Sequence, residues 1–311
     1  MKRWIAVFFM LVLALSLAAC GGSPAKPDDG NAPKTEDNTP ADPQPADPEP
    51  EPEPEPEPVY VLKDYTVLDD ENCTVTLTEI KDSAFGMLSF GIYVENKTEQ
   101  TLMFSLDEVT VNGYLNDPLW AVEVAPGKKN NSTFDFSKDS LEKYGLLPID
   151  ELRFNLRVYD SEDWAAESLV DDDFTVYPTG KTADAVTYPE RLKVDGEQVV
   201  VDNDKGTLII QSVEPDGFWG YTLNVYMENK TDSDMTFSWD DVSVNGYMVD
   251  PCWASSCPGH SAAYSSISFS DSDFEKNGIE EVEEIEYTLR MYNSEDYEGD
   301  DYVDDVFTYN P

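Results

Sequence analysis

The chain has 311 residues, with 20 Lys and Arg against 64 Asp and Glu, which gives a formal net charge of −44. The first 58 residues hold 4 basic and 11 acidic side chains, so residues 59–311 carry −37. An acidic surface of this kind repels nucleic acid and anionic lipid headgroups, which argues against both as partners. Solubility alone explains such a charge; attraction of divalent cations or of a basic partner is the alternative.

The amino terminus reads MKRWIAVFFMLVLALSLAACGG. Two basic residues precede an apolar run over residues 5–19, which is too short and too abruptly ended for a spanning helix and is typical of an export signal. The stretch LAACG at 17–21 resembles the lipobox of bacterial lipoproteins. That resemblance implies a signal peptide over residues 1–19 and a diacylated Cys20, and two acyl chains anchor a protein stably to a membrane. Ordinary secretion with an incidental cysteine is the alternative.

Residues 20–58 are dominated by Pro, Asp, Glu and small polar residues, and they end in EPEPEPEPEP. A segment with so little to bury is predicted to be disordered. Its Pro content favours polyproline II at about 3.1 Å per residue, a reach on the order of 100 Å. We therefore expect a spacer that lifts folded domains off a membrane.

The remainder is a tandem duplication with an offset of 133 residues. Residues 69–178 align with 202–311 without a gap, and roughly a third of the pairs are identical. Long-period similarity of this size indicates two domains of ordinary length. We predict domains at 59–178 and 191–311, joined by a linker at 179–190. The matching strings include ENKT at Asn96 and Asn229, VNGY at Val111 and Val244, and the Asp-Pro pairs at Pro118 and Pro251.

Apolar residues alternate with polar ones in each copy, as in half-buried antiparallel strands. One short helix is expected in each copy, at 137–145 and 270–278, with Ser and Asp at the start and Gly at the end. About seven strands in about 120 residues predict an all-β fold of two tandem immunoglobulin-like antiparallel β-sandwiches. The clearest alternating runs are CTVTLT at 73–78, LSFGIYVEN at 88–96 and RFNLRVY at 153–159.

The repeated VNGY string predicts a turn. Asn-Gly between apolar residues is typical of a two-residue hairpin loop, because a type I′ turn needs positive φ at both central positions. We expect Asn112-Gly113 and Asn245-Gly246 to occupy those positions.

The string PCWASSCPGH holds the only histidine, His260, together with Cys252 and Cys257. These three residues fall short of the four ligands of a structural zinc site. A disulfide between Cys252 and Cys257 suits an oxidising compartment. However, a separation of five places the two side chains on opposite faces of a regular strand, so two free thiols are the alternative.

Acidic clusters recur in both copies, as SED at 161–163 and 294–296 and as VDD at 170–172 and 303–305. Calcium prefers oxygen-rich loops, so these carboxylates are candidate calcium ligands; solvated loops are the alternative, since no EF-hand spacing is present. Arg157 and Arg290 are each expected to pair with a nearby acid. The candidate calcium ligands are Glu162, Asp163, Asp171, Asp172, Glu295, Asp296, Asp304 and Asp305.

Trp120 and Trp253 follow Asp-Pro in both copies. Exposed, they could stack on sugar rings as ligand-binding residues; buried, they fill the core of a sandwich. Catalysis finds no support, because the first copy has no histidine and neither a nucleophile elbow nor a phosphate-cradling loop appears. We therefore expect no enzyme.

With its lipobox, acidic Pro-rich tether and repeated ENKT, VNGY and LRVY-type strings, the chain resembles surface lipoproteins of Gram-positive bacteria with tandem immunoglobulin-like domains. The resemblance implies a lipid-anchored module on the outer face of the cell membrane that binds a protein or cell-wall component. A calcium-stabilised adhesion or spacer element is the alternative. The Cys252–Cys257 pair departs from that pattern, as does His260, which replaces Gly127 of the first copy.

Overall fold

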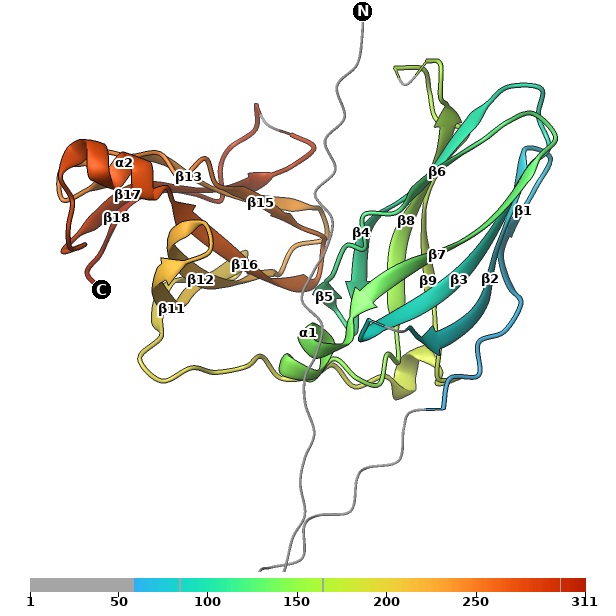
Figure 1. Cartoon of the computed structure of the whole chain (residues 1–311), viewed down its shortest axis with the longest axis horizontal. Coiled ribbons are helices and arrows are strands. Elements are labelled where there is room, and N and C mark those ends of the chain that lie inside the picture. Colours follow the sequence, from blue (N-terminus) through green and yellow to red (C-terminus); the bar gives the residue numbers. More distant parts are fainter. Residues whose placement is uncertain (1–58, 84, 164, 297) are drawn as a thin grey trace, which may run out of the picture. The chain divides into compact units, whose positions relative to one another are not determined.

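The computed structural model describes residues 59–83, 85–163, 165–296 and 298–311, which belong to one compact unit, Glu55–Pro311 (Figure 1). The expected signal peptide, Cys20 and the expected tether lie outside the described residues. The described part of the chain is all-β, with mainly antiparallel strand pairing and two short helices, as predicted. No helix in the described part of the chain is long and apolar enough to cross a membrane.

Residues 59–178, called repeat 1 below, form two sheets. One has the strand order β1-β2-β3-β7; the other runs β5-β4-β8-β9, with β6 also paired to β4. The elements are β1 (Tyr65–Asp69), β2 (Cys73–Asp82), β3 (Met87–Asn96), β4 (Leu102–Val111), β5 (Tyr114–Leu115), β6 (Ala121–Val124), β7 (Lys129–Ser137), α1 (Lys138–Lys143), β8 (Leu152–Asp160) and β9 (Val170–Val176).

Residues 191–311, called repeat 2, give the same elements in the same order. The strands start at the 133-residue offset to within one residue, so the duplication extends to the architecture. A 3₁₀ turn, η1 (Ala183–Ala185), lies between the repeats. The elements of repeat 2 are β10 (Gln198–Asp202), β11 (Gly206–Gly217), β12 (Gly220–Asn229), β13 (Met235–Val244), β14 (Tyr247–Met248), β15 (Ala254–Cys257), β16 (Ser261–Phe269), α2 (Asp271–Asn277), β17 (Ile285–Asn293) and β18 (Val303–Tyr309).

The alternating sequence pattern translates directly into burial. In β2 the side chains of Cys73, Val75 and Leu77 are buried, whereas the threonines between them are only half-buried. Successive side chains of a strand point to opposite faces, so one face of each sheet is apolar and must be covered. β3, β8 and β17 show the same inward face that the sequence predicted.

Each repeat has its own hydrophobic core between its two sheets, a sandwich-like arrangement. In repeat 1, Phe90 and Phe134 stack with ring centroids 5.2 Å apart on one sheet, and Phe104 and Phe154 of the other sheet belong to the same core. In repeat 2, Trp239 stacks on Tyr287 at 3.6 Å. Both cores lie within the compact unit Glu55–Pro311.

The VNGY turns are the predicted type I′ hairpins. Asn112 and Gly113 have φ of 48° and 79°, and Asn245 and Gly246 have φ of 51° and 79°. Each Asn side chain also forms hydrogen bonds with a neighbouring loop. The Oδ1 of Asn112 accepts the backbone N–H of Asp150 and of Glu151, both at 2.9 Å. The prediction that each VNGY string forms a hairpin turn is confirmed.

The two repeats are joined edge to edge (Figure 1). β5 of repeat 1 pairs in parallel with β16 of repeat 2, so a nine-stranded sheet runs through both. Beside this pair the ring of Tyr264 stacks on Tyr144 at 3.9 Å and on Tyr114 at 5.6 Å. The joint is therefore a packed aromatic contact as well as a strand pairing.

Candidate functional site

Trp120 and Trp253 are core residues, which corrects their prediction as ligand-binding side chains. They are only 7% and 8% exposed and belong to the two hydrophobic cores. Each indole Nε1–H donates to a serine hydroxyl of the facing sheet, Ser132 at 3.1 Å and Ser265 at 3.2 Å. A buried ring whose polar atom is already satisfied cannot stack on a sugar.

Among the described residues, the acidic loops do not bring three carboxylates together in an arrangement able to hold a metal, so calcium binding there stays a prediction. All eight candidate carboxylate residues are exposed. Asp171 and Asp172 are consecutive residues of β9, so their side chains leave opposite faces of the strand. Within residues 59–311, where described, no group of three or more His, Cys, Asp or Glu is arranged to hold a metal.

The arginines beside these loops behave differently in the two repeats. Arg290 pairs with Asp301, with its Nε 2.7 Å from Oδ2, as expected. Arg157 instead donates from Nε to the Ser168 hydroxyl at 3.1 Å. Asp301, the partner of Arg290, corresponds to the neutral Ser168 in repeat 1.

Cys252 and Cys257 are both free thiols in this structure, so the candidate disulfide is not formed. Cys252 has φ of 50° and lies exposed ahead of β15, whereas Cys257 is buried at the end of that strand. The two side chains lie in different environments, as their odd separation indicated. His260 bonds Asp232 through Nε2 at 2.7 Å and joins neither thiol in a metal site.

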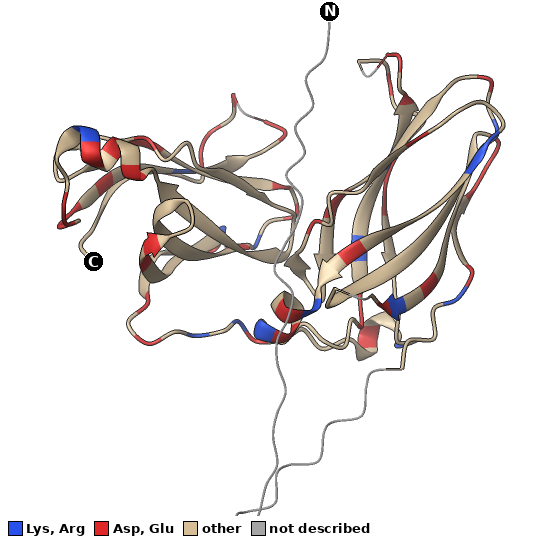
Figure 2. Cartoon of the chain, viewed as in Figure 1, with Lys and Arg blue, Asp and Glu red and all other residues tan. Residues whose placement is uncertain are grey.

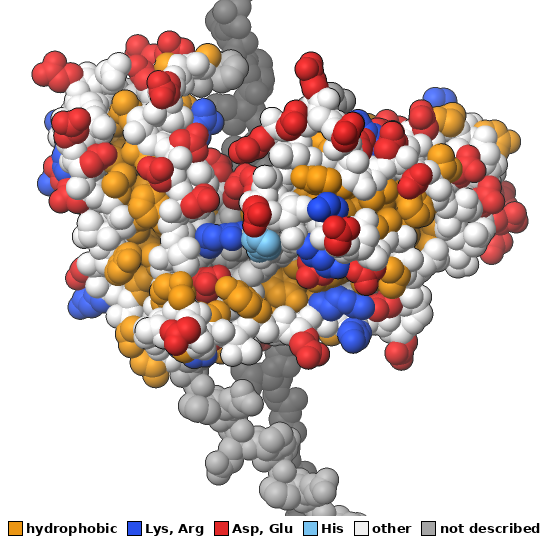
Figure 3. All heavy atoms as spheres, turned by 180° about the vertical axis from the view of Figure 1, so that it is seen from behind, with side chains coloured by type: hydrophobic (Ala, Val, Ile, Leu, Met, Phe, Trp, Pro, Cys, Tyr) orange, Lys and Arg blue, Asp and Glu red, His pale blue; other side chains and the backbone are white. Residues whose placement is uncertain are grey.

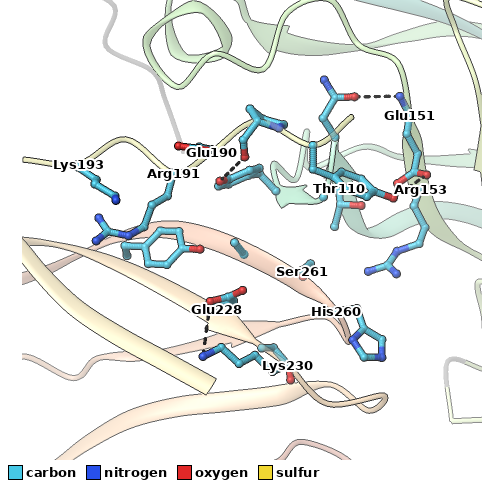
Figure 4. Close-up of a pocket in the computed structure, with 18 residues that line it drawn as sticks. Thr110, Glu151, Arg153, Glu190, Arg191, Lys193, Glu228, Lys230, His260 and Ser261 are labelled. Atoms are coloured by element: carbon cyan, nitrogen blue, oxygen red, sulfur yellow. Dashed lines mark hydrogen bonds and ion pairs between the residues drawn. The ribbon is translucent and has the colours of Figure 1, made fainter. Parts of the chain in front are cut away.

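A cavity of about 740 Å³ lies where the two repeats meet (Figure 4). Its walls come from five places in the chain: the β4–β5 turn, the start of β8, the segment 188–193, the end of β12 and the start of β16. We call it the joint groove. Tyr114 of β5 and Ala262 of β16, which pair at the joint, both line this groove.

Several of the protein's few basic side chains line the joint groove. Figure 2 marks Asp and Glu positions along the ribbons of both repeats, and Figure 3 shows the single histidine beside Lys and Arg side chains. Three glutamates line the groove as well, so its lining is mixed in charge and far less acidic than the rest of the chain. The charged lining residues are Arg153, Arg191, Lys193, Lys230, His260, Glu151, Glu190 and Glu228.

Arg153 is the cation best placed for a ligand. It lies at the start of β8, is half-buried, and points toward His260 in Figure 4. Its Nη2 donates to the backbone carbonyl of Gly259 at 2.8 Å. Within the part of the chain that the structure describes, no carboxylate forms an ion pair with it, whereas Arg191 and Lys230 are both paired with acids. A guanidinium has five donors, so Arg153 retains donors for an incoming anion.

The segment 188–193 is fixed as one wall of the groove. The Tyr188 hydroxyl donates to the Glu151 carboxylate at 3.1 Å, and the Tyr114 hydroxyl donates to the carbonyl of Pro189 at 3.1 Å. Arg191 donates from Nη1 to Glu197 at 2.8 Å, and its guanidinium holds the pKa of that carboxyl down at about 2. The guanidinium of Arg191 also lies 5.5 Å from the ring centre of Tyr226.

A second cavity, of about 840 Å³, lies between the repeats and is lined mainly by acidic residues. Asp171, Asp172 and Glu295 of the predicted acidic loops line it, together with Asp232 and Asp234 of repeat 2. The tertiary structure thus brings acidic residues of both repeats to one region, although none of the described residues there forms a metal-holding group.

Sequence reasoning did not find the joint groove. One signal was present, since the two repeats differ there: Arg153 corresponds to Glu286, and His260 corresponds to Gly127.

Comparison of the chain with protein-family models and with curated proteins gives no match in either case.

Proposed function

We propose that this chain is a lipid-anchored, non-enzymatic binding module on the outer face of a bacterial cell membrane. Two tandem immunoglobulin-like β-sandwiches hold a protein or cell-wall partner by an anionic group in the joint groove. The observation that carries the proposal is Arg153, a half-buried guanidinium in a groove of about 740 Å³ without a carboxylate partner among the described residues.

The charge of the groove supports an anionic group on the ligand. The folded unit is strongly acidic, so an anion is repelled almost everywhere else on it. Arg recognises carboxylates and phosphates through paired hydrogen bonds, and the partly enclosed groove strengthens each bond. The neighbouring ring of Tyr188, which is exposed, supplies apolar surface for the rest of the ligand.

The test is co-sedimentation of residues 55–311 with purified cell-wall sacculi, with calcium and separately with EDTA. The wild type should pellet in both conditions. Arg153→Ala should lower the apparent affinity about tenfold, the cost of losing a hydrogen bond to a charged group. Lys276→Ala removes one positive charge from α2, away from the groove, and should pellet like the wild type.

Other outcomes separate the alternatives. Pelleting only with calcium would favour a calcium-stabilised adhesion or spacer element that uses the acidic loops. A protein that stays in the supernatant throughout excludes the wall as ligand and leaves a protein partner. Equal pelleting of Arg153→Ala and wild type would remove the joint groove from the proposal.

A further inference from the structure

The joint between the repeats uses one edge strand from each. β5 lies beside β4 in repeat 1, and its other edge pairs in parallel with β16 of repeat 2, with Tyr114 opposite Ala262. The backbone N–H of Ala262 donates to the carbonyl of Gly113 at 2.9 Å. This is a head-to-tail contact, because two different surfaces meet.

The duplication gives the molecule a second copy of both surfaces. β14 of repeat 2 corresponds to β5, and it pairs only with β13 among the described strands. β7 of repeat 1 corresponds to β16, and among the described strands it pairs only with β3. One β5-type edge and one β7-type edge are therefore unused, and they belong to different repeats.

The side chains of β14 are more exposed than those of β5, because no second strand in the described part of the chain covers the β14 edge. Tyr114 is 6% exposed at the joint, whereas its equivalent Tyr247 is 50% exposed and the neighbouring Met248 is 69% exposed. An exposed aromatic and thioether pair on an open strand edge is the kind of surface that another strand covers.

The charges around the two unused edges are complementary. At the joint, Ser261 and Ala262 of repeat 2 line the same cavity as Glu151 and Arg153 of repeat 1. The 133-residue offset replaces the first pair by two exposed lysines and the second pair by two exposed glutamates. A second joint between two molecules would thus bring opposite charges together, although Lys129 already pairs with Glu95 of its own repeat, with Nζ 3.3 Å from Oε2. The residues are Lys128 and Lys129 on the β7 side and Glu284 and Glu286 on the β14 side.

We propose that the β14 edge binds the β7 edge of a second copy of this chain, in parallel register with Lys129 opposite Tyr247, so that molecules associate head to tail. The contact repeats the geometry of the internal joint, with ion pairs in place of Ser261 and Ala262. The net charge of the folded unit opposes association, so we expect a weak contact with a Kd on the order of 0.1 mM. Anchoring on one membrane would raise the local concentration.

A simpler explanation is that the two lysines keep the exposed β7 edge from pairing with another strand. The two explanations predict opposite results for the wild type. If the lysines protect the edge, the wild type is monomeric, and K128E/K129E stays monomeric or aggregates. If the lysines bind the glutamates of a second copy, the wild type associates, and K128E/K129E loses that association.

The test is sedimentation equilibrium of residues 55–311 over a concentration series up to about 1 mM, a range that covers the expected Kd. The wild type should associate reversibly. K128E/K129E alone and E284K/E286K alone should each lose association at least tenfold. An equimolar mixture of the two variants should regain it, because each mutated edge then meets a complementary one.

The mixture excludes a general charge effect. Both variants stay strongly negative, so restored association reflects the two edges and not overall attraction. K81E/K205E, with the same charge change away from both edges, should associate within a factor of about two to three of the wild type, because these exposed charges act only through screened long-range repulsion. A wild type that is monomeric throughout the series, or a mixture that does not recover, would overturn the proposal.

Discussion

Ala262 of repeat 2 donates its backbone N–H to the carbonyl of Gly113 in repeat 1, at 2.9 Å. Through this bond the VNGY turn of repeat 1 becomes part of the joint, whereas its equivalent in repeat 2 borders no second repeat. Gly113 and Gly246 share φ of 79°, but an added Cβ would meet Tyr188 Cδ1 at 3.1 Å only at Gly113. The same turn thus has different neighbours in the two repeats.

The first prediction compares alanine substitutions at these two glycines. Gly246→Ala should lower the free energy of unfolding by about 1 kcal/mol, because a left-handed residue with a Cβ is strained and no other atom is close. Gly113→Ala should cost more, since Tyr188 must also move. Urea denaturation of residues 55–311 measures both; equal costs would show that Tyr188 does not constrain the turn.

The second prediction concerns the buried tryptophans. Trp253→Ala should lower the free energy of unfolding by about 3–5 kcal/mol through loss of core packing. Trp219→Ala, at an exposed position of the β11–β12 turn, should change it by less than about 0.5 kcal/mol. Urea midpoints followed by circular dichroism check the contrast, and a stable Trp253→Ala would contradict the core assignment.

The third prediction concerns the duplicated ENKT asparagines. Asn229 is 1% exposed; its Nδ2 donates to the carbonyls of Ser233 and Cys257, both at 2.8 Å, and its Oδ1 accepts from Thr231. Asn229→Ala leaves these buried partners unsatisfied and should cost about 1–3 kcal/mol per polar group. Asn96→Ala should lower the free energy of unfolding by a similar amount. Thermal unfolding of the two variants and of the wild type measures both losses.

The fourth prediction follows from the ion pair between Arg191 and Glu197. The pKa of Glu197 is lowered to about 2, so its stabilisation is complete above about pH 4.5 and is lost as the pH falls toward 2. Glu197→Gln should therefore cost about 1–3 kcal/mol at neutral pH and almost nothing near pH 2. Urea unfolding of wild type and variant across this range tests the difference, which cancels the effects of the other carboxylates.

The fifth prediction distinguishes the thiols. Burial raises the pKa of Cys73 to about 12 and that of Cys257 to about 11, whereas Cys252 is exposed. An aromatic disulfide reagent should modify Cys252 alone in native residues 55–311 and all three thiols after denaturation, because the thiolate is the reactive form. Absence of any reactive native thiol would support a Cys252–Cys257 bridge instead.

Most of the fold could be predicted because its signals are local. Alternation with period two identified β2, β3 and β8, and the positive φ that a type I′ turn requires identified both Asn-Gly turns. The direction of the Trp120 and Trp253 rings could not be predicted, because each follows a residue of positive φ, Leu119 or Cys252, and such a residue breaks the strand alternation.

By itself the sequence determined the duplication, the strands and the turns, since these depend on periodicity and on the backbone preferences of single residues. Only the tertiary structure decided that β5 pairs with β16, that Arg153 lies beside Gly259 and that the acidic loops of both repeats line one cavity. Edge pairing is chosen by packing between surfaces far apart in the chain, such as Tyr264 against Tyr144, and no local pattern specifies it.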